Sequence, residues 1–208
     1  MQPSDFERSS GSPALEQGET GELRLAAELS RSFASSDNVD ATVRQALANV
    51  MQLLRVEAAG LFLFDEKEGD LVCRASLGPN SIEGLRVPKG SGIVGRSVAE
   101  DRIEAVEDVS RDASFYKVAD ASSGFVTRSI LCAPMRVGKN PIGAVEVLNK
   151  QNGKPFDLKD GDMLQVMANA AALAIANARL ADQLVEQESI TSALALAAEI
   201  QRSLLPAA

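Results

Sequence analysis

The sequence predicts an α+β domain with a central, mainly antiparallel sheet and flanking helices, followed by a long C-terminal helix. Apolar residues recur at helical spacing near both ends of the chain, and in the middle they form short runs separated by turns. Strands enclosed by helices in this way are typical of an α+β fold. From about residue 160 to residue 205 the sequence has no proline and a single glycine, Gly161, so we expect one uninterrupted helix there.

Composition excludes several classes of function. The 208 residues include 21 Lys+Arg, 29 Asp+Glu and no histidine, for a net charge of −8. Without histidine there are no Ser-His or Cys-His pairs and no imidazole zinc sites. The negative charge disfavours nucleic-acid and anionic-membrane partners, which bind Lys and Arg. With no membrane span and no signal peptide in the sequence, we expect a cytoplasmic protein.

The elements are expected in the following order. Residues 1–20, rich in Ser, Gly, Pro and Glu, are predicted to form a flexible leader. Helices are predicted over 22–33, from about Asp40 to Leu54 and over 93–99, with one helical turn at 114–117. The predicted strands are 58–64, 71–76, 85–87, 103–106, 129–137 and 141–148.

The C-terminal helix would be about 65–70 Å long, which is more than one small domain can cover. A heptad frame aligns Leu173, Asn177, Leu180, Leu184, Gln187, Thr191, Leu194 and Ala198. A shifted frame with Ile190, Leu194, Ala197, Gln201 and Leu204 fits better after the polar middle, as in a stutter. The helix either folds back on the domain or, the interpretation we favour, forms a weak parallel coiled coil in a homodimer.

Two motifs have simple structural explanations. Gly90, Gly92 and Gly95 match the phosphate-cradling G-x-G-x-x-G pattern, but the helix that follows is too short for a parallel crossover. A turn that opens a helix over a pocket explains these glycines better. Asp157 and Asp160 lack calcium-loop spacing and fit helix capping. We expect no catalytic residues, no metal site and no cofactor within the chain.

A cluster suited to a small polar ligand remains. Phe115, Tyr116 and Phe125 are interleaved with hydrogen-bonding residues, namely Asp120, Ser122, Ser123 and Thr127. Glu146 is an acid within an apolar strand, on the same face as Ala144 and Leu148. Its carboxyl either points to solvent or accepts N–H donors from a planar ligand in a concave pocket.

Residues from about 22 to 180 contain Phe115-Tyr116 and the runs 124–134 and 142–150, and in these they resemble a GAF domain, the small-molecule-sensing module of many signalling proteins. The cyclic-nucleotide-binding GAF domains of phosphodiesterases are the most similar. The family's Asn-Lys…Phe…Asp-Glu signature is matched at Asn149, Lys150, Phe156 and Asp160, with Gly161 in place of the glutamate. The resemblance implies that Lys150 pairs with Asp160 to support the fold.

The resemblance also implies a pocket for cyclic AMP, cyclic GMP or another small molecule. Its ligand-binding residues would be Ile93, Val94, Phe115, Tyr116, Asp120, Ser123, Thr127 and Glu146. Ser76 and Leu77 replace the aromatic residue and aspartate that read the purine in phosphodiesterase domains, which weakens the case for guanine. Two alternatives stay open. One is a dimerisation or protein-interaction GAF domain whose pocket bulky side chains fill. The other is a free-methionine sulfoxide reductase, which would need reactive cysteines, whereas Cys73 and Cys132 have apolar neighbours that predict buried thiols.

Residues 198–206, Ala-Glu-Ile-Gln-Arg-Ser-Leu-Leu-Pro, are similar to the linker that precedes SpoIIE-type bacterial serine/threonine phosphatase domains. This similarity implies that residues 181–208 are a coiled-coil linker leading to a metal-dependent phosphatase beyond Ala208. Residues 21–180 would then be a non-catalytic sensor domain that regulates the phosphatase in cis.

Overall fold

The computed structural model describes residues 39–204 except residue 66; several helical side chains, among them that of Ser123 and most beyond residue 181, are outside this description. The predicted leader and the helix predicted over 22–33 lie outside the described residues. The helices are α2 (Val39–Leu54), α3 (Gly92–Glu100), α4 (Val118–Ser123) and α5 (Leu158–Leu204), with a 3-10 turn η1 (Val109–Arg111). The strands are β1 (Val56–Phe64), β2 (Leu71–Leu77), β3 (Arg86–Val87), β4 (Glu104–Val106), β5 (Ile130–Val137) and β6 (Asn140–Lys150).

The strands form one antiparallel sheet in the order β3-β2-β1-β6-β5-β4. Both predicted hairpins are present, β1 with β2 and β5 with β6. The α+β fold with a central antiparallel sheet and a long C-terminal helix is therefore confirmed.

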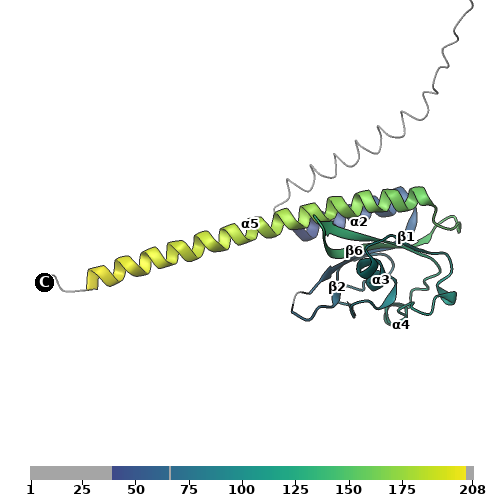
Figure 1. Cartoon of the computed structure of the whole chain (residues 1–208), viewed down its shortest axis with the longest axis horizontal. Helices are drawn as coiled ribbons and strands as arrows, with labels where there is room; N and C mark the ends of the chain where they lie inside the picture. The colour runs from purple at the N-terminus through teal and green to yellow at the C-terminus, as the bar shows by residue number, and fades with distance from the viewer. Residues whose placement is uncertain (1–38, 66, 205–208) are drawn as a thin grey trace, which may run out of the picture.

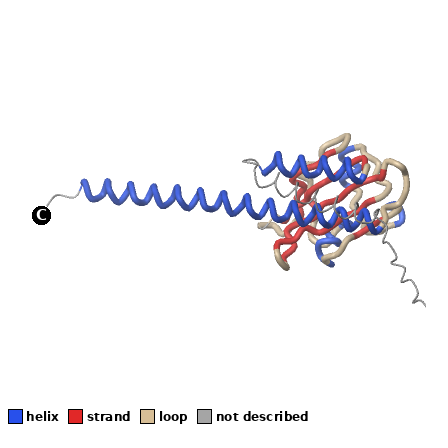
Figure 2. Tube along the Cα trace, turned by 90° about the horizontal axis from the view of Figure 1, so that it is seen from above, coloured by secondary structure: helices blue, strands red, loops and turns tan. Residues whose placement is uncertain are grey.

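Helices cover both faces of the sheet (Figure 1). On one face α2 and the first half of α5 lie side by side across the strands, as Figure 2 shows. They pack on side chains such as Leu61, Val145 and Val147. On the other face α3 packs on Phe62, Cys132 and Ala144. The alternation along β6 therefore places Glu146 on the α3 side, away from α5.

The helix α5 has 47 residues and runs well past the sheet (Figure 1). Its first part is buried against the domain through Leu164, Met167, Ala168, Ala171, Ala172 and Ile175. Only the first part of the helix therefore packs on the domain, as the alternative to a coiled coil had expected for the whole helix. The boundary predicted at residue 180 falls inside this one continuous helix.

One local prediction is wrong. Residues 114–117 do not form a helical turn, because the helical segments lie on either side of them, in η1 and α4. The Asp112 side chain accepts hydrogen bonds from the Ser114 amide and hydroxyl. Arg96 of α3 also bonds to both residues, so a contact distant in the sequence decides the shape of this loop.

Candidate ligand pocket

A cavity lies between the sheet and the elements that cover its α3 side. Its walls come from β1, β2, β6, the β2–β3 loop, the first turn of α3, α4 and the segments on either side of α4. The space inside it that water-sized molecules can reach is about 60 Å³, within a wider hollow of about 720 Å³ that includes open solvent and the gaps between atoms. A mostly apolar hollow with a few polar side chains is typical of small-molecule sites.

The structure brings most of the predicted pocket residues together. Seven of the eight line the cavity: Ile93, Val94, Phe115, Tyr116, Asp120, Thr127 and Glu146. Ser123 lies at the end of α4, and its side chain is outside the described part of the chain. The sequence did not indicate five further residues that line the cavity, namely Gly60, Phe62, Ile82, Leu85 and Leu148. All of them except Ile82 lie in predicted strands, but the sequence pattern gave no sign that a cavity lay beside them.

Glu146 faces the cavity from the middle of β6 and is only 7% exposed. Among the described residues, none donates a hydrogen bond to its carboxyl group. Its cross-strand neighbours are Gly60 on β1 and Cys132 on β5. A Cβ atom on Gly60 would lie 3.4 Å from Glu146 Oε1, so the missing side chain leaves this oxygen open space. Burial, with a smaller contribution from the charge of Asp120, raises the pKa of Glu146 to about 8.

Asp120 has a different role from Glu146. Its carboxylate accepts hydrogen bonds from the Thr127 amide at 2.8 Å and the Thr127 hydroxyl at 2.6 Å. This pair connects α4 to the segment that leads into β5. Asp120 therefore fastens one wall of the cavity, with both carboxylate oxygens already engaged by Thr127.

The first turn of α3 also faces the cavity, as the glycine pattern predicted. Gly92 begins the helix with φ +65°, and a Cβ atom there would lie 3.0 Å from Tyr116 Cβ. Glycine thus permits both the backbone conformation and the close approach. The amides of Gly92, Ile93 and Val94 are the first three of the helix and have no intrahelical carbonyl to bond. The Ser91 side chain does not cap them.

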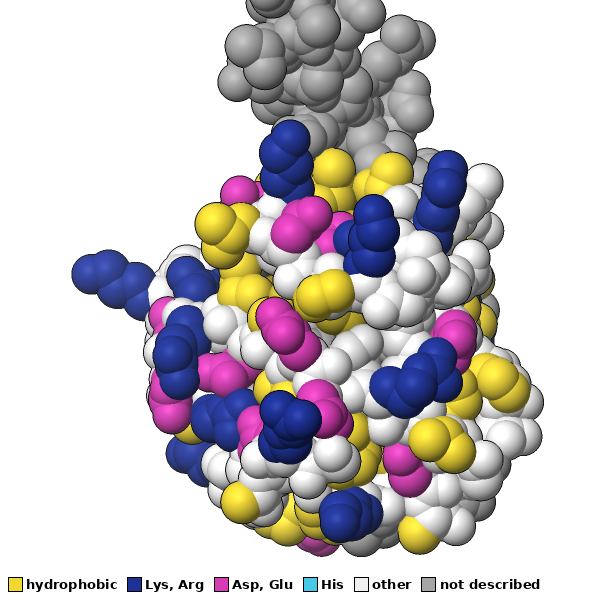
Figure 3. Space-filling model, turned by 90° about the vertical axis from the view of Figure 1, so that its right-hand side faces the viewer, with side chains coloured by type: hydrophobic (Ala, Val, Ile, Leu, Met, Phe, Trp, Pro, Cys, Tyr) yellow, Lys and Arg dark blue, Asp and Glu magenta, His cyan; other side chains and the backbone are white. Residues whose placement is uncertain are grey.

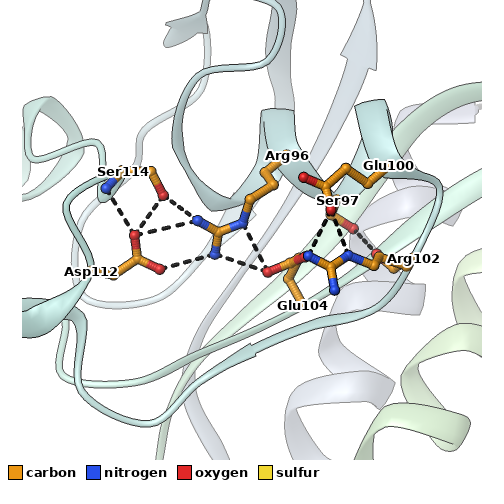
Figure 4. Close-up of polar contacts among 7 residues, drawn as sticks. All are labelled: Arg96, Ser97, Glu100, Arg102, Glu104, Asp112 and Ser114. Atoms are coloured by element: carbon orange, nitrogen blue, oxygen red, sulfur yellow. Dashed lines mark hydrogen bonds and ion pairs between the residues drawn. The ribbon is translucent and has the colours of Figure 1, made fainter.

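Arg96 joins α3 to the segment that carries Phe115 and Tyr116 (Figure 4). Its guanidinium is bonded to Glu104 on β4, to both oxygens of Asp112 and to Ser114. The pKa of Asp112 is held well below its usual range, chiefly by the hydrogen bond from Arg96. These contacts join residues 8 to 18 positions apart, and nothing in the local sequence pattern indicated them.

Asn149 supports the segment that contains Thr127. It is 1% exposed and has φ +55°, a left-handed conformation that asparagine tolerates better than most residues. Its side-chain oxygen accepts hydrogen bonds from the amides of Arg128 and Ser129, and its Nδ2 donates to the Val126 carbonyl. The first residue of the family signature therefore shapes the loop that contains Thr127.

The next residue, Lys150, pairs with Asp160 as the resemblance implied, and this prediction is confirmed. Asp160 Oδ2 also accepts a hydrogen bond from the Asp157 amide, and Asp157 Oδ1 accepts one from the Asp160 amide. This reciprocal arrangement is a capping box at the start of α5. The acidic residues are thus helix caps, as predicted, and they join α5 to the end of β6.

The two cysteines are free and buried, as predicted. Burial, with a smaller effect of Glu146, raises the pKa of Cys73 to about 12 and that of Cys132 well above its ordinary value. The thiolate is the reactive form of cysteine, so both thiols are poorly suited to redox catalysis at neutral pH.

The rest of the described chain gives few signs of other sites. Within that part, no cluster of three potential metal ligands is found, and no helix is long and apolar enough to cross a bilayer. On the face of the molecule in Figure 3, basic and acidic side chains are intermixed, without a broad basic patch.

Comparison with known proteins connects this architecture to a family. The family model described as "GAF domain" matches residues 36–176. A "Probable 3',5'-cyclic phosphodiesterase pde-5" of Caenorhabditis elegans is 26% identical over 162 residues, which are 73% of this chain and 22% of that protein. A "cGMP-specific 3',5'-cyclic phosphodiesterase" of Drosophila sechellia is 28% identical over 187 residues, covering 80% of this chain and 15% of that protein. The chain therefore spans less than a quarter of either relative.

Solved structures show the same fold. A GAF domain from a Coxiella burnetii phosphoenolpyruvate-protein phosphotransferase has a TM-score of 0.70 at 18% identity, covering 79% of this chain and 98% of that one. The free methionine-R-sulfoxide reductase of Neisseria meningitidis has a TM-score of 0.65 at 19% identity, covering 87% and 99%. The chain is distantly related to the GAF domains of phosphodiesterases, and it belongs to the GAF domain family.

Proposed function

We propose that this chain is a ligand-sensing regulatory module and that a small molecule, with cyclic nucleotides as the first candidates, binds in the cavity between β6, α3 and α4. The observation that carries the proposal is Glu146, a buried acid that faces the cavity and receives no hydrogen bond from the described residues. The unbonded amides at the start of α3 line the same cavity. An acid and a helix N-terminus in mostly apolar walls suit a flat heterocycle that carries an anionic group.

A route from the cavity to α5 supports a regulatory role. Glu146 and Lys150 lie on the same strand, and Lys150 is paired with Asp160 at the start of α5. Asn149 lies between them and bonds the loop that contains Thr127. A ligand that binds Glu146 or Thr127 therefore acts on the strand that anchors the helix. To switch the helix, it must bind one helix state more tightly than the other, and such coupling is typically worth 1–3 kcal/mol.

The outer face of α5 supports a homodimer. Val166, Leu173 and Leu180 recur at seven-residue intervals and are 45%, 55% and 59% exposed in the single chain. A second copy packed in parallel along this face would bury them. In this proposal the cytoplasmic dimer transmits the state of the pocket along α5 to a SpoIIE-type phosphatase attached in cis.

A module for dimerisation alone is the second candidate, because the apolar stripe on α5 does not depend on a ligand. Bulky side chains would then be expected to fill the space between Val94, Phe115 and Thr127. These residues instead border a hollow that is partly open to solvent. We therefore favour the sensor.

Titration calorimetry and thermal-shift measurements with cyclic AMP and cyclic GMP test the proposed function. We expect binding and a raised melting temperature for at least one nucleotide. We also expect neither effect in Gly60→Val, whose side chain would occupy the space beside Glu146 and Phe62. Circular dichroism checks that this variant is folded, and Arg74→Gln on the exposed side of β2 is the control. No binding of either nucleotide at millimolar concentration would contradict the cyclic-nucleotide form of the proposal.

A further inference from the structure

The surroundings of Glu146 restrict what kind of ligand group can meet it. The carboxyl lies in a part of the cavity whose nearest strand neighbours are Gly60 and Cys132, and neither offers it a hydrogen-bond donor from a side chain beyond a weak thiol. Buried polar groups rarely stay without partners, since each one left unpaired costs free energy. Hydrogen bonds to Glu146 therefore come from a molecule inside the cavity, either water or a ligand that displaces it.

The charges around the cavity favour the neutral form of this acid. Among the described lining residues no lysine or arginine is present, and the second charged group is acidic, Asp120 on α4. The other titratable side chains near Glu146 are the thiols of Cys73 on β2 and Cys132 on β5, both protonated at neutral pH, and the phenol of Tyr116 lines the same cavity. Arg96 of α3 is occupied by Glu104 and Asp112. With its pKa raised to about 8, Glu146 holds its proton in the empty protein at pH 7.

A protonated and an ionised carboxyl group recognise different ligand edges. The ionised group has only acceptors and matches two adjacent N–H donors, as in a guanidinium. The neutral acid has one O–H donor beside one acceptor. It matches an edge on which an acceptor nitrogen adjoins an N–H donor, as N7 and the 6-amino group of adenine do. Buried acids kept neutral so that they can donate a hydrogen bond are an established device in binding sites.

We propose, on the basis of the function proposed above, that Glu146 binds its ligand as a neutral carboxylic acid and that the pocket takes an amino-heterocycle whose edge places a ring nitrogen beside an N–H donor. An adenine-type base meets this requirement with two hydrogen bonds to the one carboxyl group. Ligands that present only N–H donors at this position are disfavoured at neutral pH, because they need Glu146 to ionise first.

This recognition makes binding depend on pH in a defined direction. Above the pKa of Glu146 in the empty protein, an adenine-type ligand needs the carboxyl to take up a proton first. Its affinity then falls about tenfold for each pH unit. Glutamine has the same donor and acceptor pair at every pH and so mimics the neutral acid.

The test is calorimetric titration of the whole chain with cyclic AMP and cyclic GMP from pH 6 to pH 9.5. For cyclic AMP we expect constant affinity up to about pH 7.5 and a loss of about tenfold per unit above pH 8. Glu146→Gln should bind cyclic AMP within about threefold of the parent at pH 6.5, with no decline at high pH. Glu107→Gln, which changes an exposed glutamate, is the matched control and should follow the parent.

Other results would overturn this inference, and they differ from the result that would overturn the proposed function. If the affinity of the parent protein for cyclic AMP stays constant or rises with pH, Glu146 does not bind the ligand as a neutral acid. This result does not depend on whether the Glu146→Gln variant folds. The same conclusion follows if a folded Glu146→Gln loses cyclic AMP, or if only cyclic GMP binds and its affinity rises with pH. In all these cases the pocket still binds nucleotide. Absence of binding by either nucleotide at every pH overturns both proposals.

Discussion

Lys150 at the end of β6 is bonded to Asp160 in the first turn of α5, and both side chains are largely buried, with exposed fractions of 14% and 12%. The same aspartate completes the capping box with Asp157. One carboxylate therefore both begins the long helix and attaches it to the strand that carries Glu146.

Replacing Asp160 with Asn should weaken this joint. The variant removes the negative charge that pairs with Lys150 and faces the helix dipole, so we expect a loss of about 1–4 kcal/mol in the free energy of unfolding. Urea unfolding measures the loss. Lys154→Met changes an exposed lysine in the same connection and should cost less than about 0.5 kcal/mol. Equal stability of Asp160→Asn and the parent would show that the pair does not hold the helix.

Thr127→Val should loosen α4. The substitution removes the hydroxyl that donates to Asp120 and leaves the backbone hydrogen bond in place. We expect a loss of about 1–3 kcal/mol, since the lost bond involves a charged acceptor. Amide hydrogen exchange in residues 118–127 should also become faster. Thr191→Val, on the exposed surface of α5, is the control. If α4 exchanges no faster in Thr127→Val than in Thr191→Val, the prediction is wrong.

Glu146→Gln should make the stability of the protein less dependent on pH. The pKa of Glu146 is about 8 in the folded protein against an ordinary value of 4.5. Between these values the folded chain retains a proton that the unfolded chain has released, so stability falls as pH rises from 4.5 to 8. The glutamine variant has no such loss. It should match the parent near pH 4 and exceed it by about 3 kcal/mol at pH 7. Urea unfolding across this pH range tests the prediction. A difference in the free energy of unfolding between the two proteins that does not change with pH would contradict it.

Leu173→Glu should prevent the proposed homodimer from forming. The side chain is 55% exposed in the single chain and lies between Val166 and Leu180 on the exposed apolar face of α5. A charge there would face its counterpart in a parallel pair, so we expect a monomer at micromolar concentration. Sedimentation velocity measures the change. Arg74→Gln alters net charge by the same amount away from α5 and should stay dimeric. A parent protein that is already monomeric would refute the seam.

The sequence predicted those parts of the fold that depend on local patterns. Apolar runs separated by turns predicted the β1–β2 and β5–β6 hairpins, and Asp157 and Asp160 indicated where α5 begins. Alternation also placed Glu146 on the face of Ala144 and Leu148. It left open whether that face meets solvent, because helices cover both sides of the sheet and apolar residues occur on both.

The features that depend on distant contacts could not be predicted in this way. The loop over 114–117 was expected to be helical, but Arg96 and Asp112 hold Ser114 in another conformation. The hydrogen bonds that Thr127 donates to Asp120 likewise became evident only with the geometry of α4 known. The cavity itself is space left by residues of several elements, and Gly60 contributes to it by having no side chain.

The central claim is that the pocket and α5 are coupled, and hydrogen-exchange mass spectrometry of the whole chain with and without saturating cyclic AMP tests it most directly. The account predicts that the nucleotide slows exchange in residues 92–96 and 118–127 and also changes exchange in the first turns of α5, residues 158–166. In Asp160→Asn the change in α5 should be reduced while that in the pocket remains. Slower exchange in the pocket with no change in α5, or no change at either place, would contradict the account.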